Sequence, residues 1–269
     1  MDLSGGIENY FSAGISLKGS LHLYWANGMA GQHIASLRPH ILASYQMNST
    51  HRIYAAFEPQ VIPQTLALNM VGNQYLSASS AVHHTDVTNS GDLGLESGWS
   101  SQVRSRLSFS VKSIKDLPLF SDLTRQGVWT TVYSGQTTIV IFYAEMFAKL
   151  TSNDYFASSI LLRSARDSYS GRQIPYTPAV EVECKGSHNF GSTVVANVRV
   201  KVVGEREADL TGDGILPGYA VFDVDGEYAV LQSLKISARI KNIFNANYEL
   251  WRGYQEFPLM IETAVQIFW

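Results

Sequence analysis

Two aspartates in a glycine-rich stretch could supply oxygen ligands to a metal ion. The stretch reads Asp209-Leu210-Thr211-Gly212-Asp213-Gly214, and calcium loops combine closely spaced carboxylates with a glycine turn. An EF-hand also needs a bidentate acid at its twelfth position, where this chain has Ala220. Asp209 and Asp213 are therefore weak metal candidates, and a polar loop rich in turn residues is the preferred interpretation.

A second group of polar residues has the wrong spacing for a metal. His83 and His84 are adjacent and Asp86 follows. Neighbouring residues of a strand point to opposite faces, so both imidazoles cannot reach one ion without a bend. No metal site is predicted here.

Three acids alternate along one short segment, as catalytic carboxylates of a glycosidase would. Asp223, Asp225 and Glu227 would share one face of a strand, about 7 Å apart. Basic residues recur with the same alternation in the flanking segments, namely Arg199, Lys201, Arg239 and Lys241. Cross-strand charge pairs that line a wet interior explain both sets more simply.

No other pattern indicates an enzyme or a cofactor. The chain has no GxSxG elbow, no P-loop and no GxGxxG opening a helix, so we expect neither catalysis nor a bound cofactor. Its single cysteine, Cys184, excludes an internal disulfide and is interpreted as an apolar filler. The formal net charge of -3 gives no basic field for nucleic acid.

Alternating apolar residues predict long strands. The clearest case is the last segment, where every second residue is apolar apart from Thr263: Phe257, Leu259, Ile261, Val265, Ile267 and Trp269. Such a period-2 pattern indicates a strand with one apolar face. About 13 residues exceed the length of an ordinary soluble strand but suit a tilted strand that crosses a bilayer.

Short and long connections alternate along the chain, as in barrels that have tight periplasmic turns and long outer loops. Short connections are expected at Met47–Thr50, Ser100–Gln102, Leu150–Asn153, His188–Ser192 and Val230–Ser233. Counting strands between them gives about 12 or 13. Val128–Lys149 is either one long bulged strand, which we favour, or two strands, and Asn73–His84 is ambiguous.

The strand segments expected between these connections run from Ile7–Ala13 to Phe257–Trp269. They are Ile7–Ala13, Ile15–Trp25, Ser36–Gln46, His51–Glu58, Leu93–Trp99, Val103–Lys115, Val128–Lys149, Asp154–Arg166, Pro178–Ser187, Thr193–Val203, Gly218–Ala229, Ser233–Phe244 and Phe257–Trp269.

These observations predict an all-β, antiparallel up-and-down transmembrane barrel occupying residues 1–269 as one domain, with outer-membrane lipid around it. Charged residues are only 16% of the chain and aromatic residues 12%, which suits a wall between lipid and water. No apolar run is long enough for a membrane helix. The first residues lack the features of a signal peptide, so we expect a removed leader or a fragment.

Several motifs follow one another in the C-terminal part of the chain: Ile174-Pro175-Tyr176-Thr177-Pro178, Val203-Gly204-Glu205-Arg206-Glu207-Ala208-Asp209, Leu216-Pro217-Gly218-Tyr219 with Asp223, and Ile240-Lys241-Asn242-Ile243-Phe244-Asn245 with Tyr248-Glu249 and Gly253-Tyr254. In this order they resemble the barrel end of TonB-dependent outer-membrane receptors. Asn73-Gln74-Tyr75-Leu76 and Gly94-Leu95-Glu96 resemble an upstream region of the same family. The family's Pro-Gly-Arg before the last strand is absent here, where Phe257-Pro258-Leu259 stands.

The resemblance implies the C-terminal part of a receptor barrel in the bacterial outer membrane that imports bulky nutrients, of the siderophore-iron or cobalamin class. Family barrels have about 22 strands and a plug domain, so we expect a partial barrel, a plug from elsewhere, and no TonB contact without that plug. The assembly machinery would read the terminal strand ending at Trp269. Outer loops would contact the ligand through Tyr248, Trp251, Arg252 and Tyr254.

Two other classes stay open. A small closed barrel acting as a passive porin or structural protein would pair its first strand with the last. A soluble β-sandwich binding module would show the same alternation with its apolar faces buried between two sheets.

Overall fold

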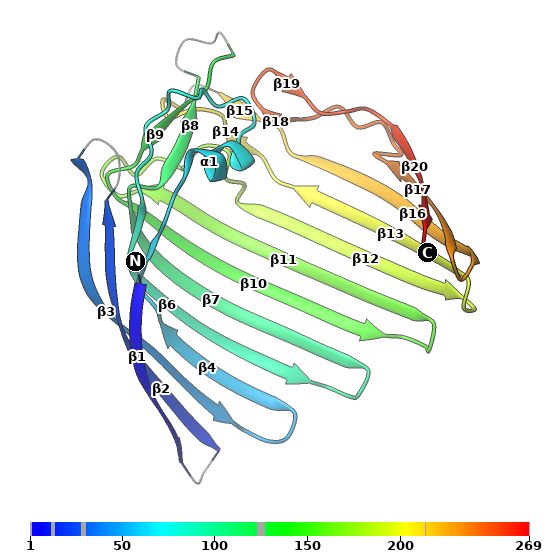
Figure 1. The fold of residues 1–269 in the computed structure, drawn as a ribbon, viewed down its shortest axis with the longest axis horizontal. Coiled ribbons are helices and arrows are strands. Elements are labelled where there is room, and N and C mark those ends of the chain that lie inside the picture. Colours follow the sequence, from blue (N-terminus) through cyan, green and yellow to red (C-terminus); the bar gives the residue numbers. More distant parts are fainter. Residues whose placement is uncertain (1, 12–13, 28–30, 123–126, 213, 269) are drawn as a thin grey trace.

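The computed structural model describes residues 2–11, 14–27, 31–122, 127–212 and 214–268. Most of the chain forms one antiparallel 14-stranded sheet, here called the wall sheet, which curves like part of a cylinder (Figure 1). Its strands are β1 (Asp2–Phe11), β2 (Ile15–Asn27), β3 (His33–Gln46), β4 (His51–Phe57), β5 (Gln60–Ile62), β6 (Thr85–Gly98), β7 (Val103–Lys115), β10 (Thr137–Lys149), β11 (Asp154–Asp167), β12 (Val180–Phe190), β13 (Val194–Val203), β16 (Tyr219–Leu231), β17 (Leu234–Lys241) and β20 (Met260–Ile267).

Neighbours in the wall follow chain order, so the topology is up-and-down. β5 pairs only with β6, beside the main path. Within the described residues β1 and β20 are the two ends of the sheet and do not pair with each other. The predicted all-β barrel wall is confirmed, and the sheet is open, which does not match the small closed barrel. The wall is one curved sheet, whereas the β-sandwich alternative requires two large sheets packed face to face.

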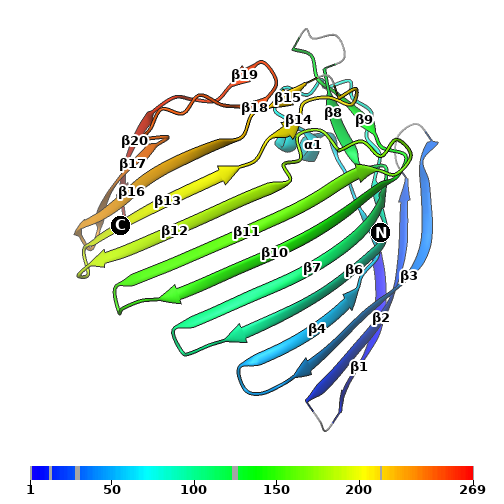
Figure 2. The same cartoon turned by 180° about the vertical axis from the view of Figure 1, so that it is seen from behind.

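The remaining elements gather at one end of the wall, here called the cap end (Figure 2). They are the paired strands β8 (Pro118–Ser121) with β9 (Thr130–Tyr133), β14 (Arg206–Glu207) with β15 (Ile215–Leu216), and β18 (Glu249–Trp251) with β19 (Tyr254–Gln255), together with helix α1 (Leu66–Gly72). We call this set the cap. Short hairpin turns occupy the opposite end, as the alternating connections predict.

Three expectations about strands need correction. Val128–Lys149 is not one continuous strand: it breaks at Ser134, so that β9 joins the cap and only β10 joins the wall. The segment Leu93–Trp99 belongs to a longer strand, β6, whose ladder continues past a bulge between Val87 and Asn89. The last strand is shorter than expected, because Phe257–Leu259 precede β20.

Side-chain alternation gives the wall two different faces. Residues opposite each other on antiparallel strands share a face, and the register places Arg52, Glu96, Arg106 and Glu145 in one cross-strand row. These four residues line a common cavity of about 720 Å³ that reaches from β4 to β12. A cavity shared by so many strands must lie on the concave side, so this charged face is the concave one.

The other face is apolar and exposed. Its residues follow the same rows on the convex side: Leu21, Leu23, Leu37, Ile41, Leu93, Leu107, Phe109, Phe142, Ile160, Leu162, Val198, Val202, Ile236, Ile261, Val265 and Ile267. An exposed apolar surface of this extent is unusual for a protein surrounded by water. Within the described residues, no helix is long and apolar enough to cross a membrane.

Candidate ligand-contact site

Aromatic rings from distant parts of the chain meet in the cap. Trp129, the residue directly before β9, is 1% exposed. Its ring lies 5.5 Å from Tyr176 and 5.2 Å from Trp251, in edge-to-face contacts, and Tyr176 lies 4.5 Å from Trp251. Such pairs add to the stability gained by burying the rings. They join the loop after β11 to the β8–β9 and β18–β19 pairs.

Tyr254 extends this cluster on the other side. Its ring stacks on Tyr75 at 3.7 Å, and its hydroxyl donates a hydrogen bond to the carbonyl of Gly127 at 3.0 Å. Three loops that are far apart in sequence are therefore held together by one side chain.

An ion pair lies beside the aromatic cluster. Arg252 Nη1 is 3.0 Å from Asp209 Oδ2, while Asp209 Oδ1 accepts hydrogen bonds from the backbone and hydroxyl of Thr211. Arg172 donates to the carbonyls of Leu210 and Thr211. Two guanidinium groups therefore bind the loop around Asp209, which the sequence suggested as a weak metal candidate. Asp213 lies outside the described residues, and the described ones contain no group of three metal-binding side chains.

A cavity of about 310 Å³ opens between these groups. Its lining includes Trp129, Tyr176 and Tyr254 as aromatic walls, and Asp122, Asp209 and Arg252 as charged groups. Burial raises the pKa of the Tyr176 phenol well above its ordinary value, although a hydrogen bond from the backbone N–H of Arg252 opposes this effect. The phenol therefore stays neutral at physiological pH.

Of the four predicted ligand-contact residues, the structure brings three together. Trp251, Arg252 and Tyr254 converge on the cavity or its aromatic wall. Tyr248 lies apart, with its ring stacked on Tyr219 at 4.2 Å, and burial raises the pKa of its phenol.

A buried arginine supports this end of the cap. Arg206, from the Val203–Asp209 motif, is 4% exposed and donates to the carbonyl of Glu249. Its guanidinium lies 5.3 Å from the Tyr219 ring, and burial lowers its pKa. The arginine of the motif therefore connects β14 to β18, which contains the predicted ligand-contact residue Trp251.

The predicted charge pairs on the concave face find different partners. Register places Arg199 opposite Asp223 and Asp225 opposite Arg239. The contacts of the basic residues run instead to acids on other strands: Arg199 to Glu183, Lys201 to Glu181 at 3.7 Å, Arg239 to Glu262 at 3.8 Å, and Lys241 to Glu262 at 3.0 Å.

The three alternating acids also bind residues on the wall strands or directly after them. Glu227 binds Lys235 at 2.7 Å. Asp225 accepts from the amide of Asn197 at 2.8 Å, and Asp223 from the backbone N–H of Asn242 at 2.9 Å.

The terminal strand presents its apolar residues outward. Ile261, Val265 and Ile267 are each more than 60% exposed on the convex face. Phe257 and Leu259 are exposed as well, but they precede the strand. Trp269 lies outside the described residues.

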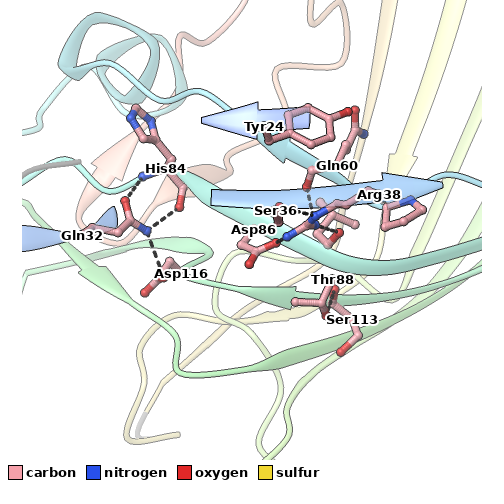
Figure 3. Close-up of polar contacts among 12 residues, drawn as sticks. Tyr24, Gln32, Ser36, Arg38, Gln60, His84, Asp86, Thr88, Ser113 and Asp116 are labelled. Atoms are coloured by element: carbon pink, nitrogen blue, oxygen red, sulfur yellow. Dashed lines mark hydrogen bonds and ion pairs between the residues drawn. The ribbon is translucent and has the colours of Figure 1, made fainter. Parts of the chain in front are cut away.

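Sequence reasoning missed a polar network that joins β3 to β6 (Figure 3). Arg38 is 8% exposed and pairs with Asp86 at 2.5 Å, while its guanidinium also donates to the carbonyls of Val87 and Gln60. Because β4 ends at Phe57, the half of β3 nearest the cap has no wall neighbour on that side. Arg38 bridges this interruption.

Gln32 makes a similar bridge nearer the cap (Figure 3). Its amide donates to Asp116 at 3.0 Å and to the carbonyl of His84 at 2.9 Å, and it accepts from the backbone N–H of His84 at 2.7 Å. The backbone of His84, one of the two adjacent histidines, therefore takes part in the polar contacts beside the wall.

Over 99% of its length the chain has the barrel fold of solved TonB-dependent receptors. The fold expected from the sequence resemblance is thereby confirmed. No family model and no curated protein matches the chain.

Three solved structures illustrate the similarity. The copper transporter OprC has a TM-score of 0.73 at 17% identity, with 47% of its chain covered. The ferric-catecholate import receptor Fiu of E. coli has a TM-score of 0.69 at 14% identity, and the ferric enterobactin receptor PfeA of Pseudomonas aeruginosa has 0.72 at 12%, with 44% of each covered. The chain thus spans less than half the length of these proteins, all of which are named as receptors or transporters.

Proposed function

We propose that the chain is the wall portion of an outer-membrane, TonB-dependent-receptor-like transporter of bulky nutrients, and not an enzyme. The observation that carries the proposal is the contrast between the two faces of the wall sheet. The convex face exposes apolar residues along nearly every strand, whereas the concave face bears the charged rows. A β-sheet surrounded by lipid on one side and water on the other needs this division.

In this proposal residues 1–269 form one barrel-wall domain in the bacterial outer membrane. The cap faces the exterior, because long loops lie on that side in outer-membrane barrels. Its aromatic cluster and Arg252 contact the nutrient. The siderophore-iron and cobalamin classes follow from the resemblance alone.

The partners also belong to the proposal. Outer-membrane lipid surrounds the convex face. The remaining strands and a plug domain come from polypeptide outside this chain, and contact with TonB runs through that plug. The barrel-assembly machinery recognises the terminal strand, including Ile261, Val265 and Ile267.

Two adjacent residues on opposite faces of β7 provide the test. Leu107 is 41% exposed on the convex face, and Arg106 lines the concave cavity. In a Cys184→Ser background, Arg106→Cys should react in intact membranes with a water-soluble maleimide small enough to enter the lumen. Leu107→Cys should react only after detergent is added. Equal labelling of both before detergent would rule out the membrane assignment.

A further inference from the structure

The two edge strands of the wall sheet run in the same direction. β5 lies off the main path, which leaves 13 strands in line from β1 to β20. Every neighbouring pair on this path is antiparallel, so the strand direction alternates at each step. In a path with an odd number of strands, the first and the last therefore point the same way.

The short strand β5 does not change this count. β4 and β5 pair with β6 one after the other along its length, with Phe57 opposite Gly91 and Gln60 opposite Val87. Pro59 lies between them and has no N–H to offer to a ladder. β5 thus continues β4 in the same direction, and the two fill one position in the path.

Both edges lack a neighbour and have the alternation of a membrane strand. Ile261 and Ile267 of β20 are 67% and 64% exposed on the convex face. Ile7 of β1 is 77% exposed, and the register places Gly5, two residues before it, opposite the convex residue Leu21. Backbone groups left unpaired in lipid cost several kcal/mol each. Both edges therefore need a further strand beside them.

The shared direction of the edges restricts what can close the wall. If β1 met β20 within one copy, or the β20 of a second copy in the same orientation, the two strands would be parallel. Parallel pairs are slightly less stable per residue, and bacterial barrels of one chain have an even number of antiparallel strands. A second copy inserted upside down would restore antiparallel pairs but would put its cap on the other side of the membrane.

We propose that a partner segment outside residues 1–269 completes the wall with an odd number of amphipathic strands. Its two outermost strands run antiparallel to β1 and to β20, and its apolar residues face lipid. A barrel of about 22 strands leaves about nine for this segment, which is an odd number, and the chain covers only 44–47% of three solved receptors and transporters. The inference rests on the proposed function, because a sheet in lipid has to close, and it specifies the partner.

Disulfide trapping on the detergent-solubilised full chain tests the direction at β20. The probe is a synthetic peptide with the sequence of β17, which pairs antiparallel with β20 on its other side. In a Cys184→Ser background the chain carries Met260→Cys or Ile267→Cys, at the two ends of β20. The peptide carries cysteine in place of Leu234 or Lys241, at its own two ends.

Antiparallel docking brings the first residue of the peptide to the last residue of β20. We expect disulfides between the Leu234→Cys peptide and Ile267→Cys, and likewise between the opposite ends, but none in the two crossed combinations. The ends of β20 lie about 23 Å apart, so a small slip in register does not blur the result. Val103→Cys and Lys115→Cys, at the ends of the interior strand β7, are the controls and should not react.

The same measurement at β1 uses a peptide with the sequence of β2. The register places Ile15 opposite Phe11 and Tyr24 opposite Asp2, so cysteines in these two combinations should form disulfides and the crossed ones should not. Antiparallel docking at both edges requires an odd number of strands between them. Parallel docking at either edge, or no disulfide at one of them, would overturn the proposal.

A double variant tests closure by this chain alone. Asp2→Cys and Met260→Cys mark the starts of β1 and β20, which a parallel seam would bring together. After oxidation in lipid vesicles we expect neither an internal disulfide nor a covalent dimer, and either product would contradict the need for a partner. Maleimide labelling of β7 involves neither edge, so its outcome tests the membrane assignment separately.

Discussion

At the scale of single residues, the Tyr176 phenol makes the cap sensitive to alkaline pH. Burial raises its pKa above the ordinary value of 10.0, so its contribution to stability is complete below pH 10 and is lost as pH rises toward the folded-state pKa. Above pH 10 the free energy of unfolding should fall by up to about 1.4 kcal/mol per pH unit from this group. Tryptophan fluorescence reports it, since Trp129 and Trp251 contact the ring.

Tyr176→Phe is the matched control for this titration. The variant keeps the aromatic packing but has no ionisable group, and all other tyrosines titrate equally in both proteins. Its fluorescence transition should therefore lie at higher pH than that of the parent chain. Coincident transitions would show that the phenol does not control the stability of the cap.

Only some residues of the aromatic cluster and its ion pair could be predicted from the local sequence. Trp251, Arg252 and Tyr254 could be predicted because they follow a recognisable strand end and combine aromatic rings with a charge. Trp129 and Tyr176 are harder to assign to the site, although Tyr176 stands in the Ile174–Pro178 motif, because their rings meet each other and Trp251 only after distant loops pack together. Their position depends on how the loops pack.

At the scale of elements, Arg38 should hold β3 to β5 and β6 where β4 is missing. Arg38→Met leaves the carboxylate of Asp86 and two backbone carbonyls without their donor. Removing one partner of a buried pair costs about 3–5 kcal/mol, so the urea midpoint of the detergent-refolded protein should drop clearly.

Arg52→Met is the comparison for that measurement. The Arg52–Glu96 pair, at 3.3 Å, has both side chains more than 40% exposed, and exposed pairs contribute about 1 kcal/mol or less. Its midpoint should change little. A similar drop in both variants would mean that Arg38 acts as an ordinary surface charge.

Alternation in the sequence predicts the wall strands well and the cap poorly. A period of two identifies a strand such as β7 or β10, but it does not state which sheet the strand joins. β9 and β10 are separated by a break at Ser134, and only their partners β8 and β7 show that they belong to different sheets. The partners of the charge pairs are hard to predict for a related reason. Arg199 binds Glu183 on one neighbouring strand and not Asp223, which lies opposite it on the other. Both strands are equally close, so the reach of the side chains decides which pair forms.

At the scale of the whole molecule, strand number follows from the sequence and closure does not. Counting apolar segments gives about 12 or 13 strands, near the number in the wall. Whether β1 meets β20 depends on curvature accumulated over every strand pair, which no local pattern encodes. In the structure the sheet is open, and β1 and β20 do not pair within the described residues (Figures 1 and 2).

The backbone amides at the two edges of that sheet should be the least protected against hydrogen exchange. β1 and β20 each pair on one side only within the described residues, and an unpaired backbone group in lipid costs several kcal/mol. For the 269-residue chain in detergent, amides of β20 should exchange with deuterium faster than those of β7, whose partners flank it on both sides. Adding polypeptide that supplies the missing strands should slow exchange in β20 and leave β7 unchanged. Equal protection of β20 and β7 in the isolated chain would mean that the edges pair, with each other or with a second copy, so the open wall would not be the form in solution.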